Sequence, residues 1–225
     1  MYKYIKRFID TIIAFIFLII LFSVNQVNAY VNDFPLLGKT IYLDAGHGGK
    51  DPGAIYDNVY EKDINLDIVK KLQFELEKLG AVVLLTRDDD YDLASIDAKK
   101  RKQSDLSKRA DLINESKCDM YISVHLNAYS STKWSGLQIF YDDINPNNKV
   151  LAEVMNETLK SNLKNVREIK RENGYFMYHK INVTGILIES GFITNSNDRY
   201  KLKDSNYQAI LARNIVSGVV NYFNK

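Results

Sequence analysis

The sequence predicts a single-domain α/β fold with a mixed, mostly parallel, twisted sheet and helices on both faces. Short apolar runs alternate with stretches of helical periodicity from residue 40 to the C-terminus, as expected when strands alternate with helices. No internal repeat or low-complexity tract interrupts these residues. The 225-residue chain is 46% hydrophobic and 26% charged, which is ordinary globular composition and excludes a disordered or fibrous chain.

The individual elements follow from local patterns. A first strand is predicted over Thr40–Asp44 and runs into a glycine-rich loop, residues 45–53. Apolar residues three and four positions apart then predict a helix from Ile64 to Leu79, ended by Gly80. The later segments are a buried strand over 81–86, a polar loop over 87–102, a helix over 104–115, strands over 119–125 and 136–141, a helix over 147–163, an aromatic segment over 174–179, a buried strand over 185–189 and a closing helix over 206–223.

The N-terminus has the order of a secretory signal peptide. Three basic residues within positions 1–7 precede an unbroken apolar run over 12–22, and the small-residue pattern Val-Asn-Ala follows at 27–29. The run is shorter than the roughly 20 residues that a membrane-spanning helix needs. An uncleaved membrane anchor is the alternative, because residues 8–24 are nearly all apolar.

These patterns divide the chain into three parts and predict its location. We expect export to the cell envelope, with a membrane contact only if the N-terminal segment stays uncleaved. The predicted parts are a signal peptide or anchor over 1–29, a short lead-in over 30–39 and one α/β domain over 40–225.

Charge and cysteine content narrow the possible functions. The net charge is +2, and the 30 basic and 28 acidic residues are interspersed after the N-terminus, so we expect no nucleic-acid partner. One cysteine, Cys118, allows neither an intramolecular disulfide nor a cysteine-rich zinc site. The chain has three histidines, so a metal site must combine His with Asp or Glu.

Residues of the kind that bind metals stand at the ends of predicted strands. Sites in open α/β sheets gather beyond the carboxyl ends of strands. His47 follows the first strand and His125 ends another, while Glu61 lies between the glycine-rich loop and the first helix. A catalytic zinc takes three such protein ligands and keeps one open position. Glu189 ends an apolar strand, where burial raises a carboxyl pKa towards the range of a general base.

Each of these residues also has a structural explanation. A glycine-rich loop after a strand is often only a turn, and a glutamate at a helix start is favoured by the helix dipole. His125 could be a satisfied core histidine, and Glu189 could pair with a structural Arg or Lys. For His179, the Asp88–Asp90 run and Cys118 we favour structural explanations: a packed or exposed histidine, a solvated loop and a buried thiol.

Longer stretches make the sequence similar to a known family. The matching stretches are TIYLDAGHGGKDPGA at 40–54, EKDINL at 61–66, TRDDD at 86–90, SVHLNA at 123–128 and ILIESGFITN at 186–195. They resemble the zinc-dependent N-acetylmuramoyl-L-alanine amidases, the Amidase_3 family, over residues 40–225. The resemblance implies one zinc ion per chain on His47, Glu61 and His125, with Glu189 as the catalytic glutamate.

Within that family the chain looks most like the germination-specific, CwlD-like branch. The uninterrupted EKDINL, the block RKQSDLSKRADLIN at 101–114 and the lack of wall-binding repeats carry this resemblance. It implies action on spore cortex, in the intermembrane space of the developing spore, and leaves room for an exported accessory protein. One departure is Val183-Thr184-Gly185, where family members often carry Pro-Ala before the last strand.

The expected reaction is hydrolysis of the amide between the lactyl group of N-acetylmuramic acid and L-alanine, in peptidoglycan glycan strands with stem peptides. Asn127, two residues after His125 and so on the same face of an extended segment, is a candidate substrate-binding residue. Three alternatives stay open. They are a peptidase that cuts within the stem peptide, a general autolysin of vegetative cells and a non-catalytic peptidoglycan-binding relative.

Overall fold

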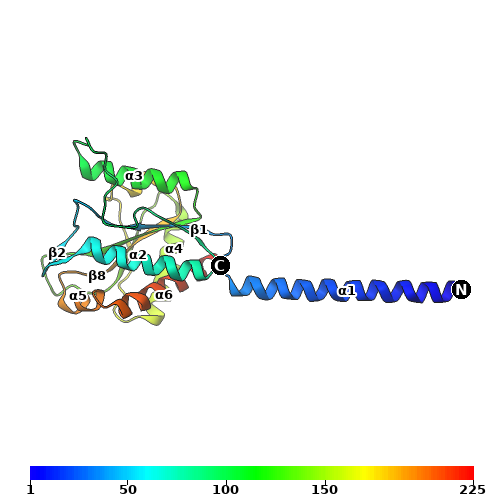
Figure 1. The fold of residues 1–225 in the computed structure, drawn as a ribbon. Helices are drawn as coiled ribbons and strands as arrows, with labels where there is room; N and C mark the ends of the chain where they lie inside the picture. Colours follow the sequence, from blue (N-terminus) through cyan, green and yellow to red (C-terminus); the bar gives the residue numbers. More distant parts are fainter.

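A six-stranded sheet forms the centre of the molecule (Figure 1). Its strand order is β4-β1-β5-β8-β6-β7, and neighbouring strands are parallel except for the antiparallel pair β6 and β8. The predicted mixed, mostly parallel sheet is therefore confirmed. The strands are β1 (Thr40–Ala45), β4 (Val82–Leu85), β5 (Met120–Asn127), β6 (Gln138–Tyr141), β7 (Lys170–Arg171) and β8 (Gly185–Phe192).

Helices cover both faces of this sheet, as predicted. Helices α2, α4 and α6 pack on one another and on one face, whereas α3 and the 3-10 turn η1 contact each other on the opposite face (Figure 1). The helices are α2 (Glu61–Lys78), α3 (Arg101–Ser116), α4 (Pro146–Asn162), η1 (Tyr178–Lys180), α5 (Ser196–Leu202) and α6 (Ser205–Phe223).

Strand periodicity decides which side chains reach which face. Along β5, Met120, Ile122 and Val124 enter the main core beneath α2, α4 and α6. The alternate residues therefore face α3 and η1, and Tyr121 joins a second apolar cluster there. His125 lies on this second face for the same reason. Fully burying an apolar side chain of this size contributes roughly 1.5–3 kcal/mol, which strongly favours this register over a one-residue slip.

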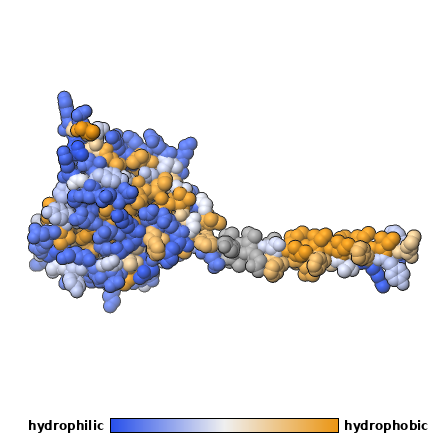
Figure 2. All heavy atoms as spheres, viewed as in Figure 1, coloured by the Kyte–Doolittle hydropathy of each residue, from blue (hydrophilic) through white to orange (hydrophobic). Residues whose placement is uncertain are grey.

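The computed structural model describes the side chains of residues 1–23 and 33–225. Helix α1 (Tyr2–Asp33) projects from the body, and its described side chains are exposed (Figures 1 and 2). Among the described residues, no helix combines the length and hydropathy needed to cross a membrane. The expected cleavage pattern at 27–29 lies outside the described side chains, so the signal peptide stays a prediction.

The predicted lead-in contains a core residue. Leu36 is fully buried in the main core, and its main-chain N–H donates a 3.0 Å hydrogen bond to the carbonyl oxygen of Leu79. The packed part of the chain therefore begins before the first strand. A functional N-terminal truncation must retain Leu36.

The structure corrects one strand prediction and adds four short elements. The segment 81–86 was expected to be a buried strand, but β4 is an edge strand with Val82 55% exposed, because it pairs with β1 alone. The predicted first helix begins at Glu61, three residues earlier than its apolar periodicity indicates. The short elements that the sequence patterns did not predict are the hairpin β2 (Ile55–Tyr56) and β3 (Val59–Tyr60), strand β7 and helix α5.

Candidate metal centre and active site

The loop after β1 brings His47 over the end of β5. His47 has a φ of 63°, in the left-handed region that non-glycine residues rarely adopt. Gly46 permits this path, since a Cβ atom there would overlap the His125 ring. Strained backbone of this kind persists only when its surroundings hold it in place.

Two buried arginines hold this loop. Arg109 on α3 donates from Nη1 to Asp44 Oδ1 at 2.7 Å and from Nη2 to the His47 carbonyl oxygen at 2.6 Å. Arg87, after β4, donates from Nε to the Ala45 carbonyl oxygen at 2.9 Å and from Nη2 to that of Gly46 at 3.1 Å. Both side chains are almost completely buried. The arginines thus supply hydrogen bonds to main-chain carbonyl oxygens of this irregular, buried loop.

Glu61 is the first residue of α2 and is buried. The Ala54 N–H donates to its Oε2 at 2.8 Å, and the Leu126 N–H donates to its Oε1 at 3.0 Å. Gly53 makes room for the carboxylate, because a Cβ atom there would lie 2.7 Å from Oε2. The helix dipole favours an acid at this position, as expected, and the carboxylate is also aimed at both histidines.

His47, Glu61 and His125 form one cluster. Glu61 Oε1 lies 3.2 Å from His47 Nε2 and 3.0 Å from His125 Nδ1, and the potential ligand atoms all lie within 4.8 Å of one another. Ligand atoms about 2.0–2.1 Å from a tetrahedral ion are roughly 3.3 Å apart. The two separations from Glu61 are close to this value, and two imidazoles with one carboxylate are a ligand set that suits a zinc ion with one position left open.

Contacts within and next to the cluster shift the pKa values of Glu61 and His47. Burial would raise the pKa of Glu61, but hydrogen bonds from His125 and His47 outweigh it and hold that pKa far below its usual range. For His47, burial would lower the pKa, but Glu61 and Asp51 raise it above its usual value. Asp51 Oδ2 lies 2.9 Å from His47 Nδ1, an arrangement that orients the ring with Nε2 towards Glu61. No helical or strand periodicity marks Asp51 as this partner, because both residues lie in the glycine-rich loop after β1.

Glu189 lies beside this cluster on β8. It is the register partner of His125, so the two side chains share the face of the sheet that carries α3. Burial, followed by the nearby charge of Glu61, raises the Glu189 pKa well above its usual value. Among the described residues Glu189 forms no ion pair with Arg or Lys, and its Oε2 has no hydrogen-bond partner. The structural alternative for this residue, a salt bridge, is therefore absent from the described part of the chain.

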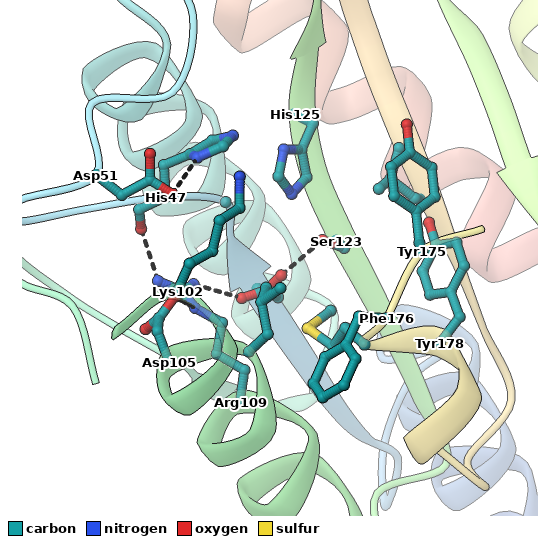
Figure 3. Close-up of a pocket in the computed structure, with 15 residues that line it drawn as sticks. His47, Asp51, Lys102, Asp105, Arg109, Ser123, His125, Tyr175, Phe176 and Tyr178 are labelled. Carbon is teal, nitrogen blue, oxygen red and sulfur yellow. Dashed lines mark hydrogen bonds and ion pairs between the residues drawn. The ribbon is translucent and has the colours of Figure 1, made fainter. Parts of the chain in front are cut away.

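A pocket of about 150 Å³ opens beside the two histidines (Figure 3). One wall comes from α3, where the side chain of Lys102 extends towards both imidazoles, and the opposite wall is aromatic. Burial and then the charge of Glu189 raise the pKa of Tyr175 in this wall to about 12, which keeps its hydroxyl protonated. The sequence patterns did not single out the pocket residues Lys102, Tyr175, Phe176 and Tyr178.

The remaining candidate residues lie elsewhere. A register irregularity separates His125 from Asn127, and Asn127 lines a neighbouring hollow instead of this pocket. His179 is exposed and contacts the Asn173 carbonyl oxygen, and Cys118 is a buried free thiol. The Asp88–Asp90 run is exposed, as expected, although Asp90 also pairs with Lys62 at 2.6 Å.

Comparison with known proteins identifies the family. A family profile described as N-acetylmuramoyl-L-alanine amidase matches residues 41–221. The chain belongs to this family. The amidase is 38% identical over 227 residues to the germination-specific N-acetylmuramoyl-L-alanine amidase of Bacillus subtilis (strain 168), covering 96% of this chain and 94% of that protein. It is also 36% identical to the probable cell wall amidase LytH of Staphylococcus aureus, over 84% of this chain and 60% of that protein.

A solved structure shares the fold. The amidase resembles the CwlD amidase from Clostridioides difficile, determined in complex with the GerS lipoprotein, with a TM-score of 0.79 and 36% identity over 83% of this chain and 99% of that chain. The fold and family expectations are therefore confirmed, and the chain is an enzyme, an N-acetylmuramoyl-L-alanine amidase.

Proposed function

We propose that this amidase removes stem peptides from N-acetylmuramic acid in spore-cortex peptidoglycan, with one zinc ion on His47, Glu61 and His125 and with Glu189 as the proton carrier. The observation that carries the proposal is the cluster of these three side chains next to a buried, unpaired Glu189. The water's oxygen is added to the lactyl carbonyl carbon, the carbon–nitrogen bond breaks, and the alanine leaves as a free amine.

The protein residues have separable roles in this reaction. When bound, zinc supplies a Lewis acid that polarises the scissile carbonyl and lowers the pKa of water towards about 7. His47, Glu61 and His125 would hold the ion, and Asp51 would fix the His47 ring. Glu189 would take a proton from the attacking water and pass it to the alanine nitrogen, a task for which a pKa near the working pH is best.

Two relatives support the biological setting. The Bacillus subtilis relative is germination-specific, and the Clostridioides difficile relative was determined with a lipoprotein. We infer that this amidase is exported, acts in the intermembrane space of the developing spore and works with an exported accessory protein. The stripped muramic acid would then serve a deacetylase and close to muramic-δ-lactam.

Mass spectrometry of muropeptides tests the reaction. Cortex and vegetative peptidoglycan are digested with the zinc-loaded enzyme, and with Glu189→Gln as the inactive control. An amidase exposes the amino group of L-alanine, whereas a peptidase exposes an amino group further along the stem. Binding without a new amino terminus would instead indicate a non-catalytic relative.

Loss of the protein tests the setting. We expect normal vegetative growth, spores whose cortex lacks muramic-δ-lactam and a block late in germination. A normal lactam content together with a cell-separation defect would place the enzyme among the general autolysins.

A further inference from the structure

A second hollow, of about 370 Å³, adjoins the catalytic face on the side away from α3. Its floor continues that face, since Gln138 on β6 is the register partner of Glu189 and also lines the hollow. Tyr175 borders this hollow as well as the pocket beside the histidines. A substrate that lies across Glu189 can therefore extend into the hollow without leaving the face.

Aromatic side chains make up half of the lining of this hollow, and three of them stay open to solvent. Trp134 is 45% exposed and Tyr129 is 58% exposed, and their rings meet edge to face with centroids 6.2 Å apart. Tyr175, which is 40% exposed, meets the buried Phe140 ring edge to face at 6.4 Å. We call this lined hollow the aromatic groove. Solvent-exposed aromatic rings in a groove next to an active site are an unusual use of apolar surface and indicate a binding surface.

Arg167 holds the groove in shape. Its guanidinium lies over the Trp134 ring at 4.9 Å and over the Phe192 ring at 5.6 Å. It also donates from Nε to Gln138 Oε1 at 3.3 Å. One residue thus contacts both the exposed indole and the side chain of Gln138, so little side-chain entropy is lost when a ligand binds.

We infer that the aromatic groove binds the glycan strand of the substrate, a role that rests on the proposed function. A pyranose ring has an apolar face of C–H groups and a rim of hydroxyl and acetamido groups. The aromatic rings can cover that face, while Gln138 and Asn127 can hydrogen-bond the rim. The stem peptide, by contrast, carries carboxylates, and both cations that line this groove already have partners. The guanidinium of Arg167 is stacked on aromatic rings, and Lys170 Nζ lies 3.6 Å from Glu172 Oε2.

This assignment gives Asn127 a different place from the one expected. The sequence pattern suggested that it binds the peptide beside His125. In the aromatic groove it would instead contact sugar, one or more residues away from the scissile amide.

Tryptophan fluorescence tests the groove directly, because Trp134 is the one tryptophan in the chain. The zinc-loaded full chain is titrated with glycan strands from which all stem peptides have been removed, which the enzyme cannot cleave. We expect a saturable change in emission, reversed by dilution. Unchanged emission, together with no heat of binding by calorimetry, would overturn the assignment.

Kinetics supply the second readout. For Trp134→Ala we compare kcat/KM on peptidoglycan strands with kcat/KM on a single-sugar substrate, N-acetylmuramoyl-L-alanyl-D-isoglutamine. We expect the strand-to-single-sugar ratio to fall roughly tenfold, the equivalent of about 1.4 kcal/mol. Phe74→Ala is the matched control, since Phe74 is also exposed (62%) but lies on α2, and it should leave the ratio unchanged.

The outcomes separate this inference from the proposed function. Release of L-alanine peptides with an unchanged ratio in Trp134→Ala leaves the amidase reaction standing and removes the glycan assignment. Glycan-dependent fluorescence without release of L-alanine peptides would support the glycan assignment and contradict the proposed reaction. If Trp134 emission does not change with glycan but changes when an exported lipoprotein is added, the groove binds a protein partner and the inference is overturned.

Discussion

Arg109 Nη2 donates a 2.6 Å hydrogen bond to the main-chain carbonyl oxygen of His47. This contact joins α3, on one face of the sheet, to the loop that carries the first candidate metal ligand. The same guanidinium pairs with Asp44 at the end of β1 and with Asp105 on its own helix. The position of His47 therefore depends on Arg109, 62 residues away in sequence, and on the buried ion pairs that hold this arginine in place.

We predict that Arg109→Ala destabilises the whole domain. It leaves the Asp44 and Asp105 carboxylates buried without their cation, which typically costs about 3–5 kcal/mol. Chemical denaturation measures the free energy of unfolding. Arg213→Ala, which removes an exposed guanidinium 3.8 Å from Glu75, is the control and should cost less than about 1 kcal/mol. Equal losses in the two variants would contradict the network's role.

The stability contributed by Asp44 should depend on pH. Burial would raise its pKa, but the charge of Arg109 and hydrogen bonds lower it to about 2. Because the folded pKa lies below the unfolded value of about 3.9, the contribution is complete above about pH 5 and is lost as the pH falls towards 2. The difference in unfolding free energy between wild type and Asp44→Asn should therefore narrow by on the order of 2 kcal/mol between pH 6 and pH 2. A difference that stays constant would refute this.

Elemental analysis should find one zinc ion per chain, removable by chelators. His47→Ala or His125→Ala leaves an incomplete set of ligands and should lose most of the zinc. Asp51→Asn removes the carboxylate that orients His47 and should weaken zinc binding by about 10–100-fold. Asp63→Asn, on the exposed side of α2, is the matched control and should bind zinc normally. Full occupancy in either histidine variant would contradict the ligand assignment.

Glu189→Gln should retain the fold and the zinc but lose about 10²–10⁴ in kcat. Glutamine has nearly the same shape as glutamate but cannot accept a proton. Circular dichroism and elemental analysis check the fold and metal, and single-sugar hydrolysis gives kcat. His179→Ala should keep its activity, because His179 is exposed and does not line the pocket. Near-normal turnover in Glu189→Gln would mean that a group other than Glu189 accepts the proton from water.

A chain that starts at Tyr30 should be soluble and bind zinc. The described side chains of residues 1–23 are exposed, whereas Leu36, which this chain retains, is buried in the main core. Size-exclusion chromatography and elemental analysis give the two readouts. Insolubility that is reversed when residues 12–24 are restored would favour an anchoring role for the N-terminal segment.

Local patterns predicted most of the fold and the identities of the candidate site residues. Helical periodicity located α2, and short apolar runs located β1, β5 and β8, because these patterns are set by which residues must be buried. The exposed side of β4 was missed for a related reason. An apolar run does not reveal whether a strand has one neighbour or two, and β4 lies at the edge of the sheet.

Residues that act through their backbone contacts were also missed. Arg87 and Arg109 occur in stretches that resemble the amidase family, but a buried arginine and an exposed arginine look alike in a sequence. The aromatic groove draws its residues from segments spread between Asn127 and Phe192, so no local pattern marks it.

The sequence by itself determined the chemical types at the site and their strand-end positions: His47 and His125 after apolar runs, Glu61 before an amphipathic helix and Glu189 at the end of a buried strand. Only the tertiary structure decided that these side chains meet. Parallel pairing of β5 with β8 sets His125 beside Glu189, and the buried arginines hold His47 in a left-handed turn above them. The physical reason is that a metal centre depends on separations of a few ångströms, which are set by strand register and buried hydrogen bonds between segments far apart in the chain.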